Sequence, residues 1–84
     1  MDFIFLVGIT AAILTTAAFI PQVIKAHRSK RTQDLSLLTY LLFSIGITLW
    51  IIYGLSLHSI PVIAANSVTL ILSLYLIFLK LKYG

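Results

Sequence analysis

Cysteine is absent from this chain of 84 residues, and charged side chains make up only 10% of it. Without cysteine the chain has no disulfide framework, no thiolate metal site and no cysteine to carry a lipid. The two histidines, His27 and His58, lie at different segment ends, so they cannot jointly hold zinc or haem. We therefore expect neither a metal nor another cofactor.

Charge is missing altogether from three long apolar runs, at about 3–24, 35–57 and 60–79. Each run is long enough to cross a bilayer, which takes about 20 helical residues at 1.5 Å each. The first run has no basic start and is long for a secretory signal, so we expect a span there. The sequence predicts an all-α membrane protein with three transmembrane helices in one domain, 1–84.

Basic residues gather on one side of these runs. Four lie in the predicted loop 25–34, and Lys80 and Lys82 follow the third run, whereas the turn around His58 has no Lys or Arg. The positive-inside rule then places the loop and the C-terminus in the cytoplasm, with the N-terminus (Met1-Asp2) and His58 outside. A net charge of +4 in clusters beside membrane spans indicates contact with membrane lipid rather than with nucleic acid. We expect a multi-pass protein of the cytoplasmic (inner) membrane.

Pro21 and Gln22 stand near the end of the first run. A proline inside a helix costs about 3 kcal/mol in water, because it removes a hydrogen bond and clashes with the carbonyl four residues back. In a bilayer the freed carbonyl of Ala17 needs a partner from within the protein. The pair suggests a helix that bends, although a tolerated membrane proline remains the alternative. One face of this run also carries small and polar residues at helical spacing: Gly8, Ala11 or Ala12, Thr15, Phe19 and Gln22.

The starts of the second and third helices carry typical capping residues. Asp34 or Thr32 can accept hydrogen bonds from the free N–H groups of the second helix. The third begins Ser59-Ile60-Pro61, a cap followed by a proline in the first turn.

Trp50 and Asn66 lie at similar depths in successive runs, seven or eight residues in from the short outer turn. Trp50 is deeper than the usual aromatic belt, so it either packs or offers its face to a ligand. An amide such as that of Asn66 needs a partner in hydrocarbon. The polar stripe around it could also bond back to its own helix: Ser59, Asn66, Thr69 and Ser73. An indole and an amide at one level suit a polyhydroxylated ring.

Across essentially its whole length the chain resembles the bacterial SemiSWEET sugar transporters of the PQ-loop group. The matching segments are Pro21-Gln22, Thr32-Gln33-Asp34-Leu35-Ser36, Trp50-x-x-Tyr53-Gly54 and Ala65-Asn66-Ser67. The resemblance implies a bundle whose third helix packs between the first two, and a parallel homodimer of two such bundles around one sugar pathway.

The same resemblance implies roles for particular residues. Trp50 and Asn66 would bind the sugar, and Pro21 with Gln22 would form the hinge of the first helix. Phe43, with Tyr40, would narrow the cytoplasmic side, and Tyr53 the external side. The outer turn reads Leu57-His58-Ser59 here instead of carrying charged residues, so outer closure would either be weaker or depend on His58.

The residues themselves support part of this function. Three packed helices leave no passage for a sugar, which favours two or more copies around an axis. Coupled carriers normally keep an ionisable group at membrane depth, and its absence favours facilitated diffusion by alternating access. No nucleophile–base pair or metal set can be assembled in the spans, so an enzyme is not expected. The alternatives are a carrier of another small polar metabolite and a small membrane subunit that transports nothing.

Overall fold

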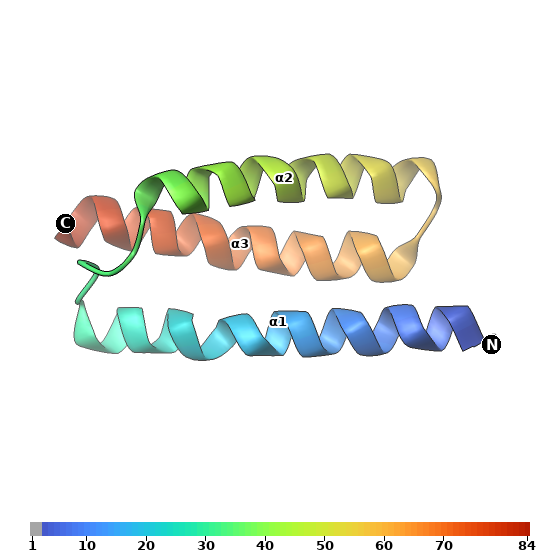
Figure 1. The fold of residues 1–84 in the computed structure, drawn as a ribbon, viewed down its shortest axis with the longest axis horizontal. Helices are drawn as coiled ribbons and strands as arrows, with labels where there is room; N and C mark the ends of the chain where they lie inside the picture. Colours follow the sequence, from blue (N-terminus) through green and yellow to red (C-terminus); the bar gives the residue numbers. More distant parts are fainter. Residues whose placement is uncertain (1–2) are drawn as a thin grey trace.

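Three helices make up the bundle, and the computed structural model describes residues 3–84, so the position predicted for Asp2 lies outside them. They are α1 (Phe3–Ser29), α2 (Leu37–Ser56) and α3 (Ile60–Tyr83). Each is long and apolar enough to cross a membrane. Helix α3 contacts both others and lies between them, as Figure 1 shows, with the N-terminus and the C-terminus at opposite ends. The predicted three-helix arrangement is confirmed.

Two of the predicted helix ends are too early. Helix α1 continues past position 24 to Ser29, so Lys25 and Arg28 are helical and the connection to α2 is residues 30–36. Lys30 ends the helix with φ at 57° and donates its N–H to the Ala26 carbonyl at 2.9 Å, as a left-handed cap does. Helix α3 likewise continues to Tyr83. An apolar run measures the thickness of the hydrocarbon, whereas a helix can continue through the headgroup region.

The cap of α2 is also not the predicted one. Ser36 occupies the N-cap position, and its Oγ accepts from the Thr39 N–H at 3.2 Å, so the assignment to Asp34 or Thr32 was wrong. Thr32 is instead buried, and its carbonyl accepts a hydrogen bond from Lys80 Nζ at 2.8 Å. Ser59 does stand at the N-cap of α3, with Pro61 in the first turn, but its side chain makes no capping bond.

The tightest packing joins α3 to its two neighbours. At the end where α1 finishes, Ala26, Leu76 and Leu79 form a small buried core. Between α2 and α3, the buried hydroxyls of Ser44 and Ser73 share a hydrogen bond of 2.8 Å. Satisfying two hydroxyls inside an apolar bundle avoids the penalty of burying them unpaired. These contacts fix how α3 is rotated relative to α1 and α2.

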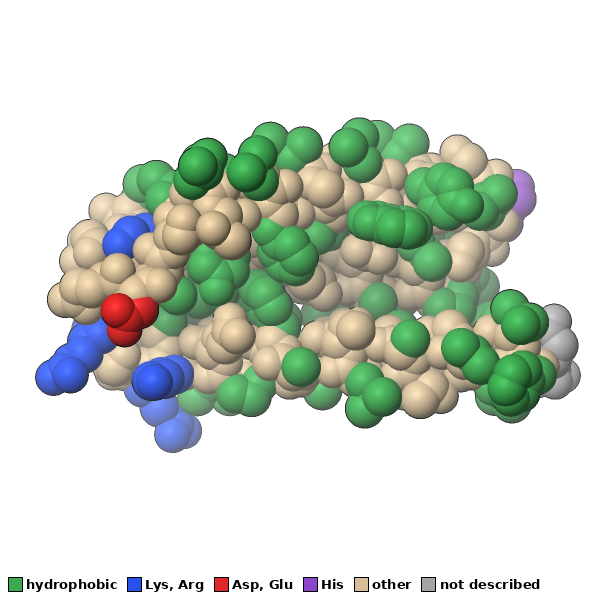
Figure 2. All heavy atoms as spheres, viewed as in Figure 1, with side chains coloured by type: hydrophobic (Ala, Val, Ile, Leu, Met, Phe, Trp, Pro, Cys, Tyr) green, Lys and Arg blue, Asp and Glu red, His purple; other side chains and the backbone are tan. Residues whose placement is uncertain are grey.

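The outer surface is largely apolar along the middle of the bundle. In Figure 2 hydrophobic side chains cover the middle, while Lys and Arg gather at the end where α1 finishes. Large apolar side chains on all three helices are exposed, among them Ile13, Leu42 and Ile71. A bilayer requires this distribution of side chains, because apolar atoms then face lipid and charged groups lie at the headgroups. The chain is a multi-pass membrane protein.

Candidate functional site

A groove of about 670 Å³ at mid-depth receives side chains from all three helices. Trp50 and Asn66 both line it, so the structure brings together the two residues that the sequence placed at one level. The volume falls within the roughly 300–1,000 Å³ typical of small-molecule sites. The full lining is Thr15, Phe19, Thr39, Leu42, Phe43, Gly46, Ile47, Trp50, Ala65, Asn66 and Thr69.

The indole of Trp50 is offered to this groove rather than buried in the bundle. It is 55% exposed, and its ring packs against Tyr53 edge to face, with centroids 5.5 Å apart and an interplanar angle of 88°. One turn before it, Gly46 leaves space: a Cβ built there would meet no atom within 4 Å. Within one chain Trp50 is therefore not a core-packing residue, and its face is accessible to a planar or ring-shaped ligand.

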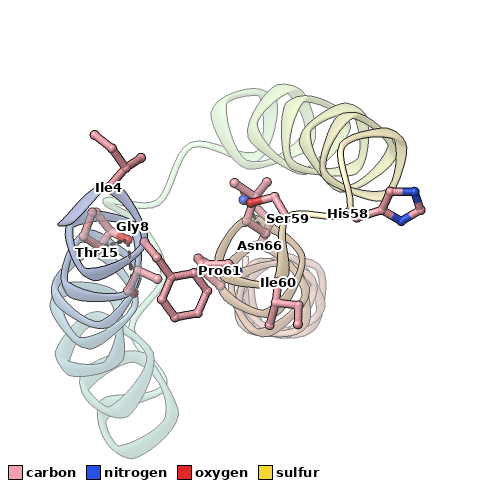
Figure 3. A pocket seen from close by; sticks show the side chains of 13 residues that line it. Ile4, Gly8, Thr15, His58, Ser59, Ile60, Pro61 and Asn66 are labelled. Carbon is pink, nitrogen blue, oxygen red and sulfur yellow. Dashed lines mark hydrogen bonds between the residues drawn. The ribbon is translucent and has the colours of Figure 1, made fainter. Parts of the chain in front are cut away.

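Asn66 is part-buried and holds its amide at the edge of the same groove. Its Nδ2 donates to the Val62 carbonyl at 2.9 Å, which uses one of the two amide donors and leaves the side-chain carbonyl for another group. In Figure 3 the Asn66 side chain points from α3 towards the gap between α1 and α2. The amide is thus anchored to its own helix while it faces the groove.

Two other members of the predicted polar stripe, Thr69 and Ser73, lie in different surroundings. Thr69 lines the groove and donates its hydroxyl to the Ala65 carbonyl at 2.8 Å. Ser73 is buried against Ser44 and does not reach the groove. The purely structural interpretation therefore holds for Ser73, whereas Asn66 and Thr69 face the cavity.

At the end of the groove nearer the loop, aromatic side chains cluster together. Phe19 stacks on Phe43 with centroids 5.8 Å apart and contacts Tyr40 edge to face at 6.3 Å. The Tyr40 hydroxyl donates to Gln22 Oε1 at 3.2 Å. Phe43, Tyr40 and Gln22 are thus linked through Phe19 and Tyr40, and their gate and hinge roles stay predictions. The sequence assigned no role to Phe19, although its three-residue spacing from Gln22 on one face was the available signal.

A second groove, of about 570 Å³, leads from the end of the bundle where α1 and α3 begin to the first groove. Both are lined by Thr15, Ala65 and Asn66, so the two join at mid-depth. Gly8 and Pro61 line it where α1 and α3 come close together, since a Cβ built on Gly8 would lie 3.5 Å from Pro61 Cβ. His58 stands at its rim with φ at 53°, and Figure 3 shows its ring pointing away from the groove. Tyr53 lies beside Trp50 instead.

Pro21 lies on an unbroken helix, because α1 runs through it from Phe3 to Ser29. Its side chain is exposed, next to Gln22, which bonds Tyr40. Among residues 3–84 no group of three His, Asp or Glu side chains could hold a metal ion.

Comparison with known proteins matches residues 3–63 to the model of the PQ loop repeat family. The chain belongs to the PQ-loop family. Two relatives called sugar transporter SemiSWEET are similar over nearly all of this PQ-loop protein. The one from Leptospira biflexa is 40% identical, over 94% of this chain and 93% of its own length. The one from Bradyrhizobium diazoefficiens is 42% identical, over 94% and 92%.

Solved structures agree with the fold of this PQ-loop chain. A crystal structure of a bacterial homologue of SWEET transporters superposes with a TM-score of 0.93 at 46% identity, covering 99% of this chain and all of that one. A SemiSWEET in the inward-open conformation superposes with a TM-score of 0.89 at 40% identity, covering 98% and 88%. The family resemblance drawn from the sequence is confirmed.

Proposed function

We propose that this PQ-loop protein is a facilitative sugar transporter that carries a mono- or disaccharide across the membrane. The observation that carries the proposal is the mid-depth groove, where Trp50 and Asn66 lie together within a membrane-spanning bundle. The names of its relatives, sugar transporter SemiSWEET, support the same substrate class. No cofactor or covalent chemistry is needed for such transport.

The groove has the chemistry that a neutral sugar requires. A sugar ring has an apolar C–H face, which the open indole of Trp50 can cover, and hydroxyl groups around its edge. The free carbonyl of Asn66 can accept from such a hydroxyl, and the hydroxyl oxygens of Thr15 and Thr69 keep lone pairs after donating to their own helix. A mostly apolar wall with a few placed polar groups is typical of ligand sites.

The groove is open along one side, and we propose that a second copy closes it. Half or more of the Trp50 and Tyr53 side chains is exposed in the single chain. Two copies inserted by the same positive-inside rule have the same orientation, so the homodimer is parallel. A twofold axis along the membrane normal then places both Trp50–Asn66 pairs around one shared pathway.

Transport by alternating access needs one closure on each side of the sugar. On the cytoplasmic side we assign it to Phe43 and Tyr40, supported by their contacts with Phe19. On the outer side we assign it to Tyr53, next to Trp50, with His58 at the rim.

Three further parts of the proposal concern movement, coupling and orientation. Pro21 and Gln22 form the hinge of α1, because the proline weakens the helix just where Gln22 bonds Tyr40. The predicted apolar runs carry no Asp, Glu, Lys or Arg, so transport runs down the sugar gradient without ion coupling. The basic end of the bundle faces the cytoplasm, in the inner membrane.

Sugar uptake into proteoliposomes tests the site. We expect Trp50→Ala and Asn66→Ala each to lower the initial rate about tenfold or more, because each removes a contact from both protomers. Phe78→Ala is the matched control for the aromatic, since Phe78 is exposed outside the groove, and Ser56→Ala is the control for the polar residue. Both controls should stay within about twofold.

Three results would contradict the proposal. Undiminished uptake by Trp50→Ala and Asn66→Ala would show that these residues do not bind the sugar. Accumulation of sugar against its gradient, driven by a pH difference, would show that transport is coupled to protons and is not uniport. A purified monomer whose melting temperature ignores sugars would support the non-transporting subunit. A homodimer stabilised by another polar metabolite but by no sugar would point to a different substrate.

A further inference from the structure

A third groove, of about 590 Å³, lies on the exposed face of α1 near its C-terminal end. Its lining is Pro21, Ile24, Lys25, Arg28 and Ser29, whose spacing of three and four residues places them on one side of the helix. Ala26, which belongs to the core with Leu76, is only 4% exposed. The groove therefore faces away from α3 and is separate from the groove of Trp50.

Among residues 3–84, no acidic side chain pairs with the two cations of this groove, Lys25 and Arg28. Asp34 is the only acidic residue in the described part of the sequence, and there it forms no ion pair with any basic side chain. The basic residues of α3 are engaged elsewhere: Lys80 donates to the Thr32 carbonyl, and Lys82 lies over the rings of Phe78 and Tyr83. Lys25 and Arg28 thus remain available to an external anion.

The groove combines these cations with an apolar floor. Pro21 and Ile24 belong to the apolar run, while Lys25 and Arg28 follow directly at the depth where the hydrocarbon gives way to headgroups. An ammonium and a guanidinium on one helix face are donors that match the oxygens of a phosphate, the guanidinium in bidentate fashion. In Figure 2 the basic side chains project outward at this end of the bundle.

From this arrangement we infer that the groove binds one anionic phospholipid. Lys25 and Arg28 hold the headgroup phosphate, and an acyl chain lies along Pro21 and Ile24. A free phosphate would use the cations but not the apolar floor, which is why we assign the lipid. The site lies outside the sugar groove and shares only Pro21 with the proposed hinge, so lipid binding through Lys25 and Arg28 can be tested whether or not the chain carries a sugar.

Native mass spectrometry of the full chain in mild detergent, titrated with dioleoylphosphatidylglycerol, tests the site. Each cation near an anionic surface contributes about fivefold in affinity, so Lys25→Gln/Arg28→Gln should bind the lipid about 25-fold more weakly. The matched control is Lys30→Gln/Arg31→Gln, which removes the same charge from the adjoining loop and should change binding less than about threefold. The single variants Lys25→Gln and Arg28→Gln should each lose part of the affinity.

Each possible outcome decides the assignment. If both double variants lose the same lipid affinity, the lipid is attracted by the net charge alone, and the proposed site is rejected. Dioleoylphosphatidylcholine binding as tightly as dioleoylphosphatidylglycerol would remove the anionic selectivity. Inorganic phosphate that competes fully with the lipid would show that the apolar floor contributes nothing. If Lys25→Gln/Arg28→Gln does not fold, undiminished binding by both single variants would reject the proposal.

Discussion

Gly54 of α2 packs directly against the first turn of α3, and its replacement by alanine tests this packing. A Cβ built on Gly54 would lie 2.9 Å from Val62 Cγ1 and 3.2 Å from Ile63 Cγ1. Real Cβ atoms are essentially never found closer than 3.0 Å to a neighbour, so the Val62 side chain or the helix that carries it would have to shift. Gly46, on the same helix, has no atom within 4 Å of the same added carbon.

Comparing Gly54→Ala with Gly46→Ala separates the steric cost of the added Cβ from the other effects of alanine. Alanine is favoured over glycine in a helix by about 0.5–1 kcal/mol, and this gain is common to both variants. Overpacking a close contact costs about 1–3 kcal/mol, and only Gly54→Ala carries that cost. We therefore expect Gly54→Ala to be less stable than Gly46→Ala by about 1–3 kcal/mol, or at least about 4 °C in melting temperature.

Reversible unfolding in mixed detergent micelles, followed by circular dichroism at fixed protein concentration, measures this difference. Adding Val62→Ala removes the methyl group nearest to the new Cβ, so the double variant should recover about 1 kcal/mol relative to the sum of the single changes. Gly46→Ala should be at least as stable as the unchanged protein but should transport more slowly, because the new methyl group narrows the groove beside Trp50. Equal melting temperatures for the two single variants would refute the close approach at Gly54.

Two further predictions use the same unfolding assay. Ser73→Ala should destabilise by about 1–3 kcal/mol because it leaves the buried Ser44 hydroxyl without its partner, and Ser44→Ala/Ser73→Ala should recover part of that loss; a double variant as unstable as the sum of both would argue against the bond. His58 has a left-handed backbone at φ 53°, so His58→Gly should raise stability by about 1 kcal/mol, His58→Asn by less, and His58→Val should lower it; a stable valine variant would show that the turn relaxes.

The helix ends show most clearly how much of the fold could be predicted from the sequence. The hydropathy of three uncharged runs correctly predicted three spans, because burial in a bilayer depends on summed side-chain polarity. It misplaced the end of α1 by five residues, from 24 to Ser29, because no change of solvent forces a helix to stop at the hydrocarbon edge. It also chose Asp34 or Thr32 over Ser36 as the cap, since any of these side chains can accept from a free N–H.

The sequence by itself determined the membrane class, the three helices and, through its resemblance to relatives, the PQ-loop family. It left open whether Trp50 packs or faces a ligand, and whether Asn66 differs in role from Ser73. Only the tertiary structure decided how these side chains are placed, with Trp50 and Asn66 at one groove and Ser73 paired with Ser44; that a ligand binds at the groove stays a prediction. The physical reason is that periodicity fixes which residues share a face of one helix. The rotation of each helix against its neighbours is set by contacts such as that at Gly54, between residues far apart in the chain.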